Sequence, residues 1–255
     1  MNKSRFAIIS FSALYLALIA VLFYQYRQNG NPYALKPEAS NRELRVFCWN
    51  GENETYEEME NESFENVYGN YYGPLKSWEA DLDGDGFVEK YELESGVFTV
   101  LRDLQVVWMS DETWHVDSFY LADSNNDGVQ DINLSVWKPG NFGDMRPFWV
   151  EENDMSVRNH FFIFNLADGR IKPVWQSSNL SVPNCRILVD DVDGDGNNEL
   201  IVIEGDYGDS ICTGKYLAVW KWDEWGFLNE WRSGEGNFEE IAIFQKDGRK
   251  CFAGF

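Results

Sequence analysis

Basic side chains are scarce in this chain. Its 255 residues include 21 Lys and Arg against 43 Asp and Glu, which gives a formal net charge of −22. Nucleic acids carry dense negative charge, and a protein that binds them needs a basic face. The composition therefore argues against a nucleic-acid partner.

Histidines and catalytic signature motifs are also scarce. The two histidines, His115 and His160, each stand alone in a strand-like run, so we expect both to be structural residues. The chain contains no G-x-S-x-G elbow, P-loop or H-E-x-x-H motif. A glycosidase-like pair of carboxylates is the enzymatic alternative, because an acidic chain always offers such pairs.

Cysteines are few, and none shows the Cys-x-x-Cys spacing of a thiolate metal or redox site. The four are Cys48, Cys185, Cys212 and Cys251. An even number in an exported domain predicts disulfides, with three pairings possible. Four separate buried thiols are the alternative.

A long apolar run occurs at the N-terminus. Phe6 to Tyr24 is 19 residues without a formal charge, which as a helix would measure about 28 Å and match the bilayer core of about 30 Å. No small-x-small cleavage site ends the run, which favours an uncleaved signal-anchor over a cleaved signal peptide. Lys3 and Arg5 precede the span, so we expect a cytoplasmic N-terminus and a periplasmic or extracellular main domain.

This reading divides the chain into three parts. Residues 1–27 form the signal-anchor, 28–42 a polar stalk and 43–255 the folded domain. In the last part, short β-branched and aromatic runs alternate with Gly, Asp and Asn clusters, which predicts an all-β fold.

Two markers repeat along this domain. The first is an acidic turn with the pattern D-x-[DN]-x-D-G-x-x-[DE], which occurs at 81–89 (loop 1), 123–131 (loop 2) and 191–199 (loop 3). The second is a strand that ends in tryptophan, at Trp49, Trp108, Trp175 and Trp231. Loops 2 and 3 begin 15 and 16 residues after Trp108 and Trp175, which indicates an internal repeat.

Four tryptophan-ended strands imply four units. The last unit is complete if the N-terminal strand around Trp49 pairs with the C-terminal hairpin at 241–252. This pairing would close a ring of about four small sheets, a small β-propeller without free edges. Cys48 and Cys251 would then lie in one sheet and pair, which leaves Cys185 to pair with Cys212.

The acidic turns carry the ligand chemistry of a calcium site. Carboxylates at positions 1, 3 and 5 point hard oxygens at one centre, Gly at position 6 permits the sharp turn, and position 9 adds another carboxylate. The predicted ligands are Asp81, Asp83, Asp85 and Glu89; Asp123, Asn125, Asp127 and Asp131; and Asp191, Asp193, Asp195 and Glu199. Loop 2 has one neutral ligand and is expected to bind most weakly. The alternative is that these are ordinary turns.

The three turns and their flanking strands resemble the Ca²⁺ loops of FG-GAP and VCBS-type β-propeller repeats. The resemblance covers roughly residues 43–255, and the turn motif is its specific part. It implies that each loop joins neighbouring strands within a blade and that the twelve residues above hold Ca²⁺. Asn141-Phe142-Gly143 echoes only the first half of the family's Phe-Gly and Gly-Ala-Pro pair, and the family commonly has seven blades.

Loop 1 also has an alternative interpretation. Asp81 to Glu92 satisfies the EF-hand pattern, with Glu92 at position 12, whereas loops 2 and 3 have Leu134 and Val202 there. An EF-hand needs a helix on both sides, and the residues before loop 1 form a poor helix. We therefore favour a turn between strands.

The sequence thus predicts a membrane-anchored, calcium-stabilised binding or assembly module at the cell envelope. Its partner would be a protein or a glycan, and Trp220, Trp222 and Trp225 could expose a ring to it. The alternatives are an enzyme acting on envelope polysaccharide through a carboxylate pair, and a calcium sensor working through residues 81–92.

Overall fold

The computed structural model describes residues 44–60, 62–63, 76–141, 148–152, 154–208, 212 and 214–255. The predicted membrane segment 6–24 and the stalk 28–42 lie outside these residues. Within them, no helix is long and apolar enough to cross a membrane. They form sixteen β-strands and no helix, which confirms the all-β prediction.

The strands form four antiparallel sheets of four strands each. Three of these sheets are simple meanders along the chain. The first sheet contains β3 (Ser77–Ala80), β4 (Glu89–Glu94), β5 (Val97–Arg102) and β6 (Gln105–Met109). The second contains β7 (His115–Ala122), β8 (Asp131–Pro139), β9 (Val157–Ala167) and β10 (Arg170–Gln176). The third contains β11 (Asn184–Asp190), β12 (Glu199–Glu204), β13 (Tyr216–Asp223) and β14 (Gly226–Arg232).

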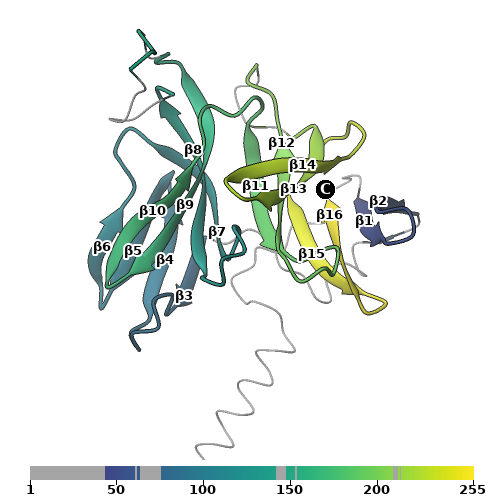
Figure 1. Ribbon diagram of the computed structural model, residues 1–255, viewed down its shortest axis with the longest axis horizontal. Coiled ribbons are helices and arrows are strands. Elements are labelled where there is room, and N and C mark those ends of the chain that lie inside the picture. Colours follow the sequence, from purple (N-terminus) through teal and green to yellow (C-terminus); the bar gives the residue numbers. More distant parts are fainter. Residues whose placement is uncertain are drawn as a thin grey trace, which may run out of the picture.

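The fourth sheet joins the two ends of the described chain. Its strands β15 (Ile241–Lys246), β16 (Arg249–Gly254), β1 (Arg45–Asn50) and β2 (Thr55–Met59) lie in that order. In Figure 1 the purple N-terminal pair lies beside the yellow C-terminal hairpin. The predicted pairing of the Trp49 strand with that hairpin is therefore confirmed.

Both predicted disulfides are also confirmed. Cys48 and Cys251 are directly opposite each other in β1 and β16 and are bonded, as are Cys185 and Cys212. The first bridge links residues 203 positions apart in the sequence. Two disulfides indicate an oxidising, extracytoplasmic environment.

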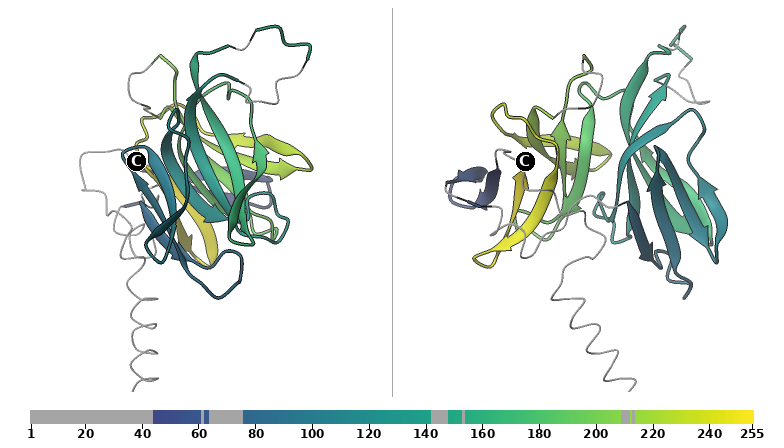
Figure 2. Two further views of the ribbon diagram at one scale, coloured as in Figure 1. Left: turned by 90° about the vertical axis from the view of Figure 1, so that its left-hand side faces the viewer. Right: turned by 180° about the vertical axis from the view of Figure 1, so that it is seen from behind.

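Neighbouring sheets pack through aromatic rings. Between the first and second sheets, the centroids of Phe98 and Phe119 are 4.8 Å apart, and between the second and third sheets those of Phe161 and Phe227 are 5.4 Å apart. Phe47 of the fourth sheet lies 4.8 Å from Trp231 of the third. Figures 1 and 2 show the four sheets in this sequential order.

The described residues do not show a closed ring of sheets, so the propeller stays a proposal. The tryptophan marker also needs one correction. Trp108, Trp175 and Trp231 lie in the fourth strands β6, β10 and β14 of their sheets, whereas Trp49 lies in β1, the third strand of its sheet. Trp49 packs on Tyr56 at 4.9 Å within that sheet. It is therefore not a fourth copy of the same repeat position.

Candidate metal sites in the acidic loops

The three acidic loops occupy the same place in three sheets. Each joins the first strand to the second: loop 1 joins β3 to β4, loop 2 joins β7 to β8 and loop 3 joins β11 to β12. This confirms that the repeated turns lie between strands. The β15–β16 turn of the fourth sheet has Asp247-Gly248 at this place and no acidic loop.

Backbone geometry explains the Gly and Asp spacing. In each loop a carboxylate oxygen at position 1 accepts a hydrogen bond from the position 6 amide, at 3.0 Å in loop 1, 2.7 Å in loop 2 and 3.2 Å in loop 3. Position 6 has a left-handed φ of 87–93°, which favours glycine. Position 4 is left-handed too, in Gly84, Asn126 and Gly194, a feature that the pattern left unspecified.

The EF-hand interpretation of residues 81–92 is wrong for the described structure. Loop 1 is flanked by strands β3 and β4, and Glu92 pairs with Ser77 across these strands. Because Glu92 lies in β4, the loop has no helical arm after it. The calcium sensor built on a helix–loop–helix loses its support.

Two loops bring acidic side chains together closely enough to hold a metal ion. One oxygen each from Asp81, Asp83 and Asp85 lie within 4.8 Å of one another in loop 1. In loop 3 the same holds for Asp191, Asp193 and Glu199. Of the predicted ligands in these two loops, Glu89 and Asp195 are outside these groups. Among the described residues, the loop 2 carboxylates Asp123, Asp127 and Asp131 do not form such a group.

The position 9 carboxylates open the second strand of their sheets. Glu89, Asp131 and Glu199 are all fully buried. Burial raises the pKa of Glu89, raises that of Asp131 to about 7 and raises that of Glu199 to about 8. An ionised carboxylate is thus disfavoured at each position, and a bound cation would remove that cost.

Loop 1 already binds a basic side chain. Arg102, at the end of β5, contacts Glu89 and lies 2.8 Å from Oδ2 of Asp85 and 3.7 Å from Oδ2 of Asp83. Oδ1 of Asp83 and Oε2 of Glu89 are buried without a hydrogen-bond partner. The guanidinium therefore pairs with only some of the carboxylate oxygens of loop 1.

Loop 3 repeats this arrangement with a lysine. Nζ of Lys221 in β13 lies 2.6 Å from Oδ2 of Asp193, 3.0 Å from Oδ2 of Asp195 and 3.8 Å from Oε1 of Glu199. Glu199 is directly opposite Lys221 in the β12–β13 ladder. The ammonium therefore contacts the oxygens that a metal ion would need.

Loop 2 differs because the residue opposite its position 9 on the third strand of the sheet is neutral. In the β8–β9 ladder Ile132 pairs with Phe164, so Asp131 and Asn165 are the next pair along. Among the described residues, no Lys or Arg forms an ion pair with the acidic groups of loop 2. Both oxygens of Asp131 and Oδ1 of Asn165 are buried without a hydrogen-bond partner.

The high pKa of Asp131 follows from these surroundings. Burial is the largest cause, and the negative charges of Asp127 and Asp123 add to it. The amide of Ser124 offsets part of the rise, although it lies outside hydrogen-bonding geometry. Several acceptor oxygens without a donor are what a hard cation would satisfy.

The loops also hold neighbouring sheets together. Oδ2 of Asp83 in loop 1 accepts a hydrogen bond of 3.1 Å from the Gly169 amide in the second sheet. Loops 2 and 3 form direct hydrogen bonds. Oδ1 of Asn126 accepts one from the Asn198 backbone N–H at 2.7 Å, and the Asn198 side chain donates one to the Asp123 carbonyl at 2.8 Å. Ordering a loop therefore orders a junction between sheets.

One surface pocket bears on the enzymatic alternative. A shallow pocket contains two carboxylates, Glu52 and Glu57, but hydrogen bonds from Asn50 and Asn53 lower the pKa of Glu57. A glycosidase needs a general acid with a raised pKa. His160 is fully buried, and its burial lowers its pKa to about 4, as expected for a structural residue.

No protein-family model and no curated protein sequence matches this chain.

Proposed function

We propose that this chain is a calcium-stabilised binding or assembly module displayed outside the cytoplasm. The finer parts of the proposal are a small propeller of FG-GAP or VCBS type in residues 43–255 and a membrane anchor in residues 6–24. The disulfides and the repeated loops at matching places in three sheets support it.

The observation that carries the calcium part is Asp131. It is fully buried, its pKa is raised by the charges of Asp123 and Asp127, and no basic side chain among the described residues pairs with it. Glu89 and Glu199 occupy the same position in their sheets, but each has a basic residue nearby. We infer from this uncompensated carboxylate, and not from the spacing of the oxygens, that loop 2 depends most on a metal ion, the reverse of the order expected from ligand charge alone.

The preference for Ca²⁺ over Mg²⁺ rests on the ligand set. Each loop offers several carboxylate or amide oxygens from one turn. Ca²⁺ accepts six to eight oxygens in irregular geometry, whereas Mg²⁺ demands a near-ideal octahedron and keeps several of its waters. A loop that supplies most ligands itself favours the larger ion.

Thermal unfolding of the full-length chain tests this function. The protein would be melted in a polyoxyethylene detergent with 5 mM Ca²⁺, 5 mM Mg²⁺ or EDTA. A ligand that binds only the folded state at 100 times its Kd adds about 2.7 kcal/mol of stability. We expect Ca²⁺ to raise the melting temperature more than Mg²⁺ does.

Matched variants assign the effect to the loops. Asp127→Asn should remove the largest share of the Ca²⁺-dependent rise, and Asp83→Asn and Asp193→Asn smaller shares. Glu112→Gln changes the net charge equally at an exposed turn outside the loops and serves as the control. Identical melts in Ca²⁺ and EDTA would show that the loops are only turns.

A further inference from the structure

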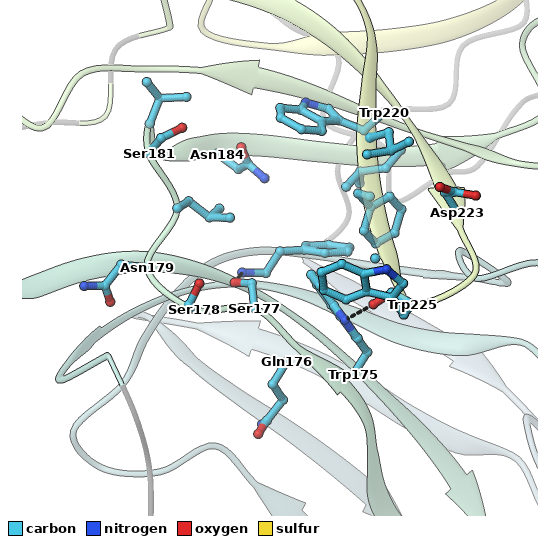
Figure 3. A pocket seen from close by; sticks show the side chains of 17 residues that line it. Trp175, Gln176, Ser177, Ser178, Asn179, Ser181, Asn184, Trp220, Asp223 and Trp225 are labelled. Carbon is cyan, nitrogen blue, oxygen red and sulfur yellow. Dashed lines mark hydrogen bonds between the residues drawn. The ribbon is translucent and has the colours of Figure 1, made fainter. Parts of the chain in front are cut away.

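A pocket of about 390 Å³ lies between the second and third sheets. One side is the segment that follows β10, residues 177–184, and the other is the β13–β14 hairpin. Its volume falls within the range of about 300–1,000 Å³ typical of small-molecule sites. Figure 3 shows the two sides facing each other.

The hairpin side is an aromatic wall that includes one exposed tryptophan. Trp225 stands at the tip of the hairpin with 81% of its surface exposed. Its backbone is fixed, because the Trp175 indole N–H donates to the Trp225 carbonyl at 2.8 Å. Trp175 in turn packs against Phe227 at 5.6 Å and Trp222 at 5.8 Å. The Trp225 backbone is thus anchored to packed aromatic rings while its side chain is mostly exposed.

The opposite side presents neutral polar groups. Ser177, Ser178 and Ser181 lie along it, whereas the Asn179 side chain points away from the aromatic wall, as Figure 3 shows. Oδ1 of Asn179 is buried and has no hydrogen-bond partner in the described structure.

This polar segment is rigid as well. The Asn179 backbone N–H donates a hydrogen bond to Oδ1 of Asn141 at 2.7 Å, and the Leu180 carbonyl accepts one from the Tyr207 hydroxyl at 2.8 Å. The Cys185–Cys212 disulfide closes the segment at its end. A rigid site does not lose the ordering entropy that a mobile one loses on binding.

Charge restricts the ligand. Asp223 is the one ionisable residue that lines the pocket, and the whole chain carries a net charge of −22. An anionic ligand would meet repulsion without a basic partner. Amides and hydroxyls both donate and accept hydrogen bonds, which suits a ligand rich in hydroxyl groups.

We propose that this pocket binds a neutral sugar ring, as part of a glycan. The C–H groups on one face of a pyranose carry partial positive charge and stack on the negative π face of an indole. The hydroxyls at the rim of the sugar then reach the serines opposite. This inference names the ligand class of the proposed binding module and therefore rests on that function.

Saturation-transfer NMR on the full-length chain tests the proposal. Maltose, cellobiose, lactose and N,N′-diacetylchitobiose would be tested at up to 10 mM in a polyoxyethylene detergent, which carries no sugar. Choline and indole test the competing ligands, an organic cation and an apolar aromatic. We expect at least one disaccharide to bind, and Trp225→Ala to weaken it at least tenfold. Trp149→Ala, which removes another exposed tryptophan, should leave binding unchanged.

A second variant guards against a disturbed aromatic wall. Ser178→Ala should also weaken the sugar at least threefold without a change in melting temperature, because Ser178 is an exposed lining residue. Failure of every disaccharide to bind, or equal binding by Trp225→Ala, would overturn the proposal, as would preferential binding of choline or indole. Measuring the melt in Ca²⁺ and EDTA alongside separates the two hypotheses: a Ca²⁺-dependent melt without sugar binding refutes the pocket alone, and sugar binding with identical melts refutes the calcium part alone.

Discussion

Replacing Asp131 by Asn should stabilise the protein without calcium and weaken its response to calcium. In EDTA the buried carboxylate is a cost, because its pKa rises from the ordinary value of 3.8 to about 7. The amide carries no charge, and its N–H groups can donate to the unpartnered Oδ1 of Asn165. With Ca²⁺ the same change removes a ligand.

The magnitude follows from the pKa. At pH 8 a rise from 3.8 to about 7 corresponds to up to about 4 kcal/mol of folding free energy, at 1.36 kcal/mol for each factor of ten. For a domain of this size 1 kcal/mol shifts the melting temperature by about 2–4 °C. Asp131→Asn should therefore raise the melting temperature in EDTA by up to about 8–16 °C.

Calorimetric melts at pH 8 in EDTA and in 5 mM Ca²⁺ check this sign reversal. The variant should melt above the wild type in EDTA and gain less from Ca²⁺. Glu112→Gln, with the same change in net charge, should shift both melts by less than about 0.5 kcal/mol. A variant that is less stable than the wild type in EDTA would refute the reasoning, because the carboxylate would then be favourable without a metal.

Three further predictions concern the same loops. In EDTA the melting temperature of the wild type should fall as pH rises from 4 to 8, because Asp131 and Glu199 keep protons in the folded state that the unfolded chain has released. Ca²⁺ should flatten this fall, and a melting temperature that rises with pH in EDTA would contradict the prediction. Lys221→Met should lower the melting temperature in EDTA and increase the Ca²⁺ affinity of loop 3, because it frees oxygens of Asp193 and Asp195. Calcium titration calorimetry would detect the change, and an unchanged affinity would show that the ammonium does not compete with Ca²⁺. Glu92→Gln should leave Ca²⁺ binding within twofold in the same titration, since Glu92 lies in β4 rather than in an EF-hand, and a tenfold loss would restore the sensor hypothesis.

Local features of the fold were predictable from the sequence. The Asp and Gly spacing of the loops encodes a turn whose hydrogen bonds close within six residues. The fourth sheet was predictable because the N-terminal strand otherwise lacked a partner, and this placed Cys48 opposite Cys251.

The residues that lie beside position 9 of each loop were not predictable, because the pairing of strands distant in the sequence places them there. Arg102, Asn165 and Lys221 follow their loops at different sequence distances, because the connections between the strands differ in length. Their shared place beside position 9 becomes visible only when the ladders are aligned. The pocket was not predictable for the same reason, because its two walls come from different sheets. The sequence drew attention to its tryptophans Trp175, Trp220 and Trp225 but not to the serines opposite them.

Direct calcium titration of the metal-free, full-length protein tests the central claim. Isothermal titration calorimetry would compare the wild type with Asp127→Asn and Asp83→Asn. The account predicts that the tightest site disappears in Asp127→Asn and persists in Asp83→Asn, because loop 2 alone has no basic side chain beside its carboxylates among the described residues. Loss of the tightest site in Asp83→Asn, or no calcium binding by the wild type, would contradict it.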